Sequence, residues 1–356
     1  MKITDILQHR LISQHITGTH CTKPEEIVQY LLAVQSQDYA MAKWAIGLRL
    51  PDSTEKMIDA AFDEGRILRT HVMRPTWHFV TPKDIRWLLA LTAPRVHAIN
   101  ASYNRKTELD NRIFKRCHAA FEKALRNNNY LTRTGLQEVL RRARIPAEGI
   151  RLALIVMHAE LEGLICSGPR QGKQFTYALL QERAPDAKLR ARDEALAELT
   201  LRYFKTRGPA TLADFAWWSG LTMKDVRDGV GMLGSELVQE KIEGVEYIFC
   251  HDVPGKPGKP VSTFLMPDYD EYGISYKDRG ILYRKRKDLL SVNIGNAFFH
   301  MIVVDGVMGG TWKRMVKGKN LIIETEFFEK LNQRQQQAVT KSTKRYHSFF
   351  GNATEQ

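Results

Sequence analysis

The sequence has few cysteines and no apolar run long enough to cross a membrane. The four cysteines, Cys21, Cys117, Cys166 and Cys250, lie far apart, so no Cys-x-x-Cys pair indicates a zinc knuckle or a redox site. The N-terminus does not resemble a signal peptide. We therefore expect a cytoplasmic protein in a reducing compartment, without membrane contact.

Common motifs of metal, nucleotide and hydrolase sites are also missing. The sequence has no His-Glu-x-x-His, no Gly-x-Ser-x-Gly and no phosphate-binding glycine motif. His71 and His78 flank one predicted hairpin, but no carboxylate or third histidine stands at ligand spacing from them. We accordingly predict neither a metal nor a cofactor.

Basic residues are in clear excess. The chain has 53 Lys and Arg against 40 Asp and Glu, which gives a formal net charge of +13. That balance favours a polyanionic partner, nucleic acid before an acidic membrane surface, although a merely basic protein would share it. The 356 residues are too many for one compact core, so several domains are expected.

The order of helices followed by a hairpin occurs three times. Hairpins are predicted within residues 67–81, 164–177 and 237–250, each after a group of helical segments. Helices followed by a basic hairpin describe a winged helix. Residues 254–260, rich in proline and glycine, indicate a linker, and strands then precede a closing helix at 325–345.

We therefore predict a mainly α protein with β hairpins, of the α+β class, in which three tandem winged-helix units precede a β-rich C-terminal domain. The predicted domains are a first winged helix at 1–103, a second at 104–186, a third at 187–253 and the C-terminal domain at 254–356.

Two glutamines one residue apart are the first candidates for chemistry. Gln35 and Gln37 follow the amphipathic segment 24–34 and precede the apolar run 41–50. In a regular helix their side chains would point about 200° apart. They can act on one target only if the helix ends or bends there. The plain alternative is that they cap backbone groups or face solvent.

The hairpins supply candidate DNA contacts. Basic residues beside an aromatic ring suit phosphate contact together with base stacking or wedging. The first hairpin's tryptophan could equally pack into the domain core. The predicted contacts are Arg69, His71, Arg74, Trp77 and His78 in the first hairpin and Arg170 and Lys173 at the tip of the second.

Two further clusters have structural interpretations. Trp217 and Trp218 stand in an apolar helix, so we expect both in the core. An acidic cluster could form an acid–base pair, but a structural turn paired with nearby basic residues is the favoured interpretation. Its members are Asp268, Asp270 and Glu271, with Lys277, Arg279 and Arg284 as the expected partners.

Four stretches in this order and spacing resemble one family, the winged-helix DNA-binding domain-containing proteins that include the AlkZ- and YcaQ-type DNA glycosylases. The stretches are Val34-Gln35-Ser36-Gln37-Asp38, Leu68-Arg69-Thr70-His71-Val72-Met73-Arg74-Pro75-Thr76-Trp77-His78, Arg207-Gly208-Pro209-Ala210-Thr211-Leu212-Ala213-Asp214-Phe215 and Leu265-Met266-Pro267-Asp268-Tyr269-Asp270-Glu271-Tyr272.

The resemblance implies excision of N-alkylated bases from double-stranded DNA and the unhooking of interstrand crosslinks. The family's catalytic Gln-aliphatic-Gln motif maps onto Gln35 and Gln37, with Ser36 in the aliphatic position. The family hairpin usually has Arg-Gly-Thr, whereas this chain has Pro75 in place of the glycine. We expect a monomer, associated with the nucleoid and bound preferentially to alkylated or crosslinked duplexes.

An amide pair suits such chemistry. An N7- or N3-alkylated purine is already cationic and leaves without protonation, so a strong base is less necessary. Amide groups can orient the attacking water and stabilise the developing positive sugar. We therefore predict a monofunctional DNA glycosylase in which Gln35 and Gln37 position the water. Lys43, the nearest lysine, is expected on the solvated surface and not as a Schiff-base nucleophile.

Two other functions remain open from the residues alone. A non-catalytic winged-helix regulator or architectural protein would have the same tandem units. A hydrolase that uses Asp268 and Asp270 is a third interpretation.

Overall fold

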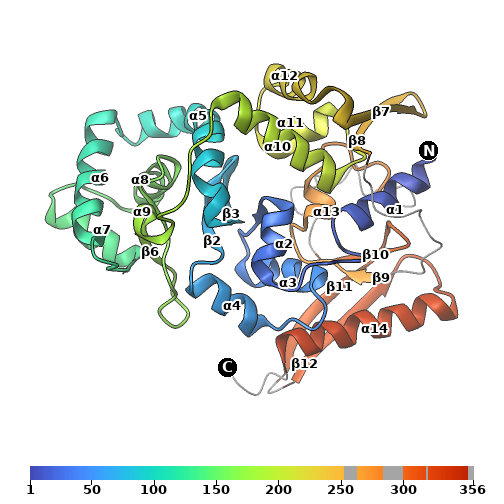
Figure 1. The fold of residues 1–356 in the computed structure, drawn as a ribbon. Coiled ribbons are helices and arrows are strands. Elements are labelled where there is room, and N and C mark those ends of the chain that lie inside the picture. Colours follow the sequence, from blue (N-terminus) through green and yellow to red (C-terminus); the bar gives the residue numbers. More distant parts are fainter. Residues whose placement is uncertain (252–262, 284–299, 318–319, 352–356) are drawn as a thin grey trace. The chain divides into compact units, whose positions relative to one another are not determined.

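The computed structural model describes residues 1–251, 263–283, 300–317 and 320–351, and these form two compact units (Figure 1). The first unit comprises Met1–Ile58, Ala197–Trp218 and Thr222–Gln356, and the second comprises Asp59–Leu196 and Ser219–Leu221. The N-terminal helices therefore share a unit with the C-terminal sheet. The finer division into four domains stays a prediction.

Helices make up much of the described chain, and one short 3-10 turn, η1 (Gly234–Glu236), follows the twelfth of them. The α-helices are α1 (Ile3–Ser13), α2 (Pro24–Leu31), α3 (Tyr39–Arg49), α4 (Glu55–Asp63), α5 (Pro82–Lys106), α6 (Asn111–Leu125), α7 (Arg133–Arg142), α8 (Gly149–Leu161), α9 (Leu180–Arg183), α10 (Arg192–Arg207), α11 (Leu212–Ser219), α12 (Met223–Leu233), α13 (Glu271–Ile274) and α14 (Gln333–Phe350).

The strands are short until the C-terminal sheet begins. They are β1 (Val34–Gln35), β2 (Leu68–Val72), β3 (Arg74–Val80), β4 (Leu131–Thr132), β5 (Ile165–Ser167), β6 (Thr176–Leu179), β7 (Leu237–Ile242), β8 (Val245–Cys250), β9 (Thr263–Leu265), β10 (Met301–Val304), β11 (Val307–Lys317) and β12 (Asn320–Phe327).

The order of elements repeats along the chain. The run α2-β1-α3-α4-β2-β3 is followed by α6-β4-α7-α8-β5-β6 and then by α10-α11-α12-β7-β8. In the second run, β4, β6 and β5 form one antiparallel sheet beside a core that includes Phe114, Leu136 and Ile155. The predicted order of helices and then a hairpin is confirmed, whereas the count of three winged-helix units stays a prediction.

Local turn chemistry explains the hairpins. Glu243 and Gly244, at the turn between β7 and β8, both have positive φ, 48° and 85°. Such a turn matches the twist of the strands on either side of it. Between β2 and β3 the chain reverses at Met73, whose φ is 62°, and Pro75 lies inside β3.

The C-terminal part forms a four-stranded antiparallel sheet in the order β12-β11-β10-β9. Asp305 and Gly306, at the turn between β10 and β11, both have positive φ. The helix predicted at 325–345 was misplaced: β12 pairs with β11 as far as Phe327. The helix begins later because the side chain of Asn332 accepts a hydrogen bond from the backbone nitrogen of Gln335 at 2.9 Å. The predicted linker at 254–260 lies outside the described residues.

Aromatic side chains join this sheet to α3 and α14. Trp44 and Trp312 both pack against Tyr346, with ring centroids 4.9 and 5.0 Å away. The indole nitrogen of Trp44 donates to the carbonyl of Leu265 at 2.7 Å, and that of Trp312 donates to the carbonyl of Met266 at 2.9 Å. The indoles thereby hold the chain where it leaves β9. No described helix is long and apolar enough to cross a membrane.

A glycine permits α14 to approach α3. A Cβ atom added to Gly47 would lie 2.4 Å from the ring of Phe349, which is 3% exposed. We expect Gly47→Ala to lower the free energy of unfolding by about 1–3 kcal/mol through overpacking. The matched control is Gly231→Ala on α12, where a Cβ meets nothing within 4 Å. It should gain about 0.5–1 kcal/mol, and urea unfolding of both variants measures the difference.

Candidate functional site

The two glutamines stand at a break between helices. Helix α2 ends at Leu31, and Leu32 has φ 68° and ψ −49°, which turns the chain into β1. Asp38 then starts α3, since its Oδ1 accepts a hydrogen bond from the nitrogen of Met41 at 3.0 Å. The chain therefore leaves the helix before the glutamines, as their convergence requires, but the helix ends at Leu31 and not at Val34.

Their side chains take different environments. The backbone nitrogen of Gln37 donates to Oε1 of Gln35 at 3.2 Å, so the two residues are linked directly. Gln35 is 9% exposed, whereas Gln37 and Asp38 are exposed. Ser36 is fully buried between them. The segment thus has one buried side-chain amide, that of Gln35, and one solvent-facing side-chain amide, that of Gln37.

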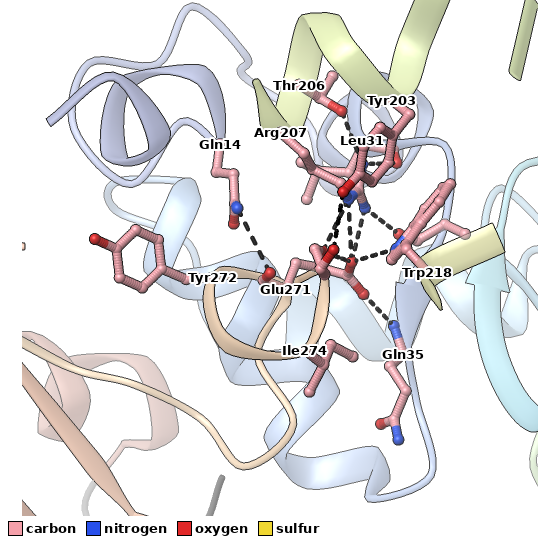
Figure 2. Close-up of polar contacts among 12 residues, drawn as sticks. Gln14, Leu31, Gln35, Tyr203, Thr206, Arg207, Trp218, Glu271, Tyr272 and Ile274 are labelled. Carbon is pink, nitrogen blue, oxygen red and sulfur yellow. Dashed lines mark hydrogen bonds and ion pairs between the residues drawn. The ribbon is translucent and has the colours of Figure 1, made fainter. Parts of the chain in front are cut away.

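The buried carboxylate of Glu271 binds the backbone of the glutamine segment (Figure 2). Oε1 of Glu271 accepts a hydrogen bond from the backbone nitrogen of Gln35 at 3.0 Å. Oε2 accepts from Arg207 Nη2, Trp218 Nε1 and Ser275 Oγ, each at 2.8 Å. Figure 2 shows the side chain of Gln35 extending away from this cluster. Glu271 therefore orients the backbone of the motif and leaves its amide outside the cluster.

The partner arginine fixes the break itself. Arg207 donates to the carbonyl oxygens of Leu31 at 2.9 Å and Ala33 at 3.1 Å, on either side of Leu32 (Figure 2). Its guanidinium also lies 4.1 Å from the centre of a Trp218 ring. Carbonyl groups left without partners at a helix end are thus satisfied by a charged donor.

The acidic cluster is mainly structural, but its partners were predicted wrongly. Asp270 binds Arg49 through both carboxylate oxygens, at 2.8 and 2.9 Å, and both side chains are fully buried. Glu271 pairs with Arg207, not with the nearby Lys277 or Arg279 of the prediction. Arg284 lies outside the described residues. Instead, α3 and α10 bring Arg49 and Arg207 to this buried turn.

Asp268 differs from its neighbours. Its Oδ1 accepts a hydrogen bond from the backbone nitrogen of His300 at 2.6 Å and lies 3.2 Å from Nδ1 of the same residue. Burial raises the pKa of Asp268, the bond from His300 opposes this shift, and the negative charge of Asp38 adds to it. The carboxyl group of Asp268 therefore lies close enough to Asp38, next to the glutamine motif, to be affected by its charge.

Two other expectations need correction. Lys43 is not solvated, because its side chain is 4% exposed and ion-paired with Glu55. Trp218 is buried as predicted, but Trp217 is 45% exposed, with its indole nitrogen donating to the carbonyl of Ile274. Helical neighbours face different directions, so an apolar helix buries only one of such a pair.

The first hairpin turns several predicted DNA contacts inward. Arg69 is 8% exposed, and its guanidinium lies between the rings of Trp77 and Phe175, 4.4 and 4.6 Å from their centres. His71 is 4% exposed and paired with Glu160. These side chains stabilise the hairpin and offer little surface to DNA.

The remaining candidates vary in exposure. His78 is fully buried, with Nδ1 3.0 Å from the carbonyl of Thr76, whereas Arg74 and Trp77 are half-buried. Arg170 is held by Asp59 at 3.0 Å and Asp63 at 3.7 Å. Lys173 is exposed at the tip that follows Gly172.

Sequence reasoning missed the residues that hold the motif. Arg207 stands in one of the four stretches quoted above, but nothing in its local sequence indicated Glu271 as its partner. Nothing in the sequence indicated that Arg49 would be buried and paired, because it occupies the last turn of an apolar helix.

Comparison with known proteins shows the family of this chain. The family described as "DNA glycosylase AlkZ-like" matches residues 28–349. A protein of Streptomyces sahachiroi named "Interstrand DNA cross-link repair glycosylase" is 24% identical over 303 residues, which cover 81% of each chain. The solved structure of the S. sahachiroi DNA glycosylase AlkZ shares the fold, with a TM-score of 0.78 at 19% identity over 98% of this chain and 96% of the other.

The matched residues run from α2 through α14 and so include the glutamine motif, Arg207 and Glu271. The regulator interpretation loses its support, because the shared family is one of enzymes. The chain belongs to the AlkZ-like family of DNA glycosylases.

Proposed function

We propose that the protein hydrolyses the N-glycosidic bond of N7- and N3-alkylated purines in double-stranded DNA, and that Gln35 and Gln37 place the attacking water. The observation that carries this proposal is the bond from the backbone nitrogen of Gln37 to the side chain of Gln35, on a backbone that Glu271 holds from inside. A fixed backbone reduces the movement needed to position the amides once the substrate is bound, and catalysis by orientation depends on such preorganisation.

The amides determine which bases can leave. Neutral carboxamides accept and donate hydrogen bonds but do not remove a proton from water effectively. A cationic purine needs no such help, because its glycosidic bond is already weakened. The chemistry therefore selects positively charged lesions and leaves normal bases in place.

Nearby carboxylates can stabilise the sugar as the bond breaks. Asp38 is exposed beside Gln37, and Asp268 lies close enough to respond to its charge. Negative charge fixed near a developing oxocarbenium ion lowers the barrier to its formation. In this proposal the amides orient the water while the carboxylates stabilise the cationic sugar.

The exposure of the motif suits crosslinked substrates. A base joined to both strands cannot swing freely into a closed pocket. Gln37 and Asp38 are exposed, so this end of the motif stands on a surface, while Gln35 lies just beneath it. The name of the S. sahachiroi relative refers to interstrand crosslink repair, which supports extending the proposal to unhooking.

The reaction in this proposal is hydrolytic. Lys43 is buried and bound to Glu55, so its ammonium is engaged away from the role of a Schiff-base nucleophile. The product is an abasic site with an intact backbone. The protein acts as a monomer on duplex DNA within the nucleoid, with affinity that comes mainly from phosphate contacts of its excess Lys and Arg.

The first prediction concerns the motif. Gln37→Ala should lower the single-turnover rate of N7-methylguanine excision about 100-fold, because the water loses its orienting group. Gln35→Ala should also lower it, since Oε1 of Gln35 holds the backbone of Gln37. Alkaline cleavage of abasic sites in a labelled duplex gives the rate, and a binding titration shows whether DNA affinity is unchanged.

The matched control is Gln29→Ala, an exposed glutamine on α2 just before the motif. It should excise at the wild-type rate. Uracil in the same duplex should remain, because it is a neutral base. Wild-type protein that releases no N7-methylguanine would overturn the proposed reaction, and silent substitutions at both motif glutamines would overturn only the assigned site.

The second prediction concerns the brace. Glu271→Gln leaves Arg207 charged and unpaired in the interior, so the free energy of unfolding should fall by about 3–5 kcal/mol. Urea unfolding measures it. Asp228→Asn is the control, because its partner Lys224 is 84% exposed and such surface pairs contribute little. Equal losses in both variants would contradict the importance of the buried pair.

The third prediction concerns the tip of the second hairpin. Lys173→Ala should weaken duplex binding to the same degree for every sequence and reduce the slope of log affinity against log salt by about 0.9, the value expected for one lost phosphate contact. Lys173→Arg keeps the charge and should keep the slope. Titrations at several salt concentrations test this, and an unchanged slope in Lys173→Ala would remove the residue from the interface.

A further inference from the structure

Three histidines and a glutamate gather in the second unit, and none of them is among the residues proposed for catalysis. His97 lies on α5, His118 on α6 and His158 on α8, and Glu162 immediately follows α8. Histidine nitrogens and carboxylate oxygens are the ligand atoms that zinc and related metals take from proteins. Their meeting at the junction of three helices is the strongest feature that the glycosylase function leaves unexplained.

Distances within the cluster are short enough for a shared ion. His97, His158 and Glu162 each offer one ligand atom, and these atoms lie within 4.8 Å of one another. Around a tetrahedral zinc ion, bonds of about 2.0–2.1 Å place neighbouring ligand atoms roughly 3.4 Å apart. Side-chain rotation alone can close the difference, because Glu162 is half exposed and at the end of its helix.

One ring nitrogen in the cluster faces the carboxylate directly. Nε2 of His97 is buried and lies 2.8 Å from Oε1 of Glu162. This separation is shorter than the roughly 3.4 Å between two ligands of one tetrahedral zinc ion, so the carboxylate moves outward when the ion enters.

The remaining histidine can orient a ligand. Nε2 of His118 lies 3.2 Å from Nδ1 of His158, and the ring of His158 stacks on Phe114 with centroids 3.7 Å apart. A metal-bound histidine usually has its other nitrogen held by a second group. His118 fills that place and leaves Nε2 of His158 for the ion.

The cluster also borders open space. A cavity of about 340 Å³, lined by His97 and Glu162 together with Arg86, Pro94 and Leu161, gives water access to the ion.

We propose that His97, His158 and Glu162 bind one zinc-type divalent ion that ties α5 to α8, with His118 as a positioning residue. The sequence predicted no metal, because His97 is far from the other two ligands along the chain. Only the spacing of His158 and Glu162, four residues apart and so on one helix face, could have indicated the site.

The test uses the full-length chain with any affinity tag removed and metal stripped by a chelator. Calorimetric titration with Zn²⁺ should give one ion per chain, and Co²⁺ should produce the visible absorption of a low-symmetry nitrogen and oxygen site. His97→Ala should weaken Zn²⁺ binding at least 100-fold, and Glu162→Gln at least 10-fold. His118→Gln should weaken it 10- to 100-fold, the range seen for residues that orient metal ligands.

Two control variants distinguish this site from nonspecific binding of Zn²⁺ at the protein surface. Glu148→Gln changes an exposed glutamate at the other end of α8, and His20→Ala removes an exposed histidine of the first unit. Both should bind Zn²⁺ as the wild type does. The proposal is overturned if the wild type binds no Zn²⁺, or if His97→Ala and Glu162→Gln bind it undiminished. Since Glu162 is half exposed, its substitution should leave the fold intact, which circular dichroism verifies.

Discussion

The ion pair between Glu271 and Arg207 is the interaction on which the shape of the glutamine segment depends. Both side chains are fully buried, and burying two charges costs more than their attraction returns unless every remaining polar atom finds a partner. Here the partners are the backbone nitrogen of Gln35, the carbonyl oxygens of Leu31 and Ala33, and the side chains of Trp218 and Ser275. Because three distant stretches supply these groups, the pair can be satisfied only when the break after α2 has its observed shape.

This arrangement bears on the proposed role of the two glutamines. A carboxamide contributes little acid or base strength, so its value lies in being in the correct place beforehand. The charged pair stays inside and sets the backbone, while Gln37 reaches solvent and can meet DNA. Asp38 begins α3 and Asp268 is bonded to His300, so both carboxylates beside the motif are fixed as well. Buried contacts thus fix the backbone of a segment whose Gln37 and Asp38 side chains face solvent.

Much of the fold and part of the site could be predicted from local pattern. The break at Gln35 and Gln37 followed from the change between two apolar runs, and the third hairpin followed from Gly244. Features that depend on distant residues could not be predicted. The start of α14 depends on an asparagine cap that competes with a continuing strand, and Lys43 is buried because α4 brings Glu55 to it. The partners of Asp270 and Glu271 come from α3 and α10, which no local pattern connects to them.

The hairpin residues show why residue type alone does not identify a DNA contact. Arg69 and His71 are basic and adjacent to an aromatic residue, as a contact surface requires, yet an arginine between two rings and a histidine beside a glutamate are equally good interior elements. Their burial makes the hairpin stiff. A residue type is therefore informative about a contact only once its burial and its partners are known.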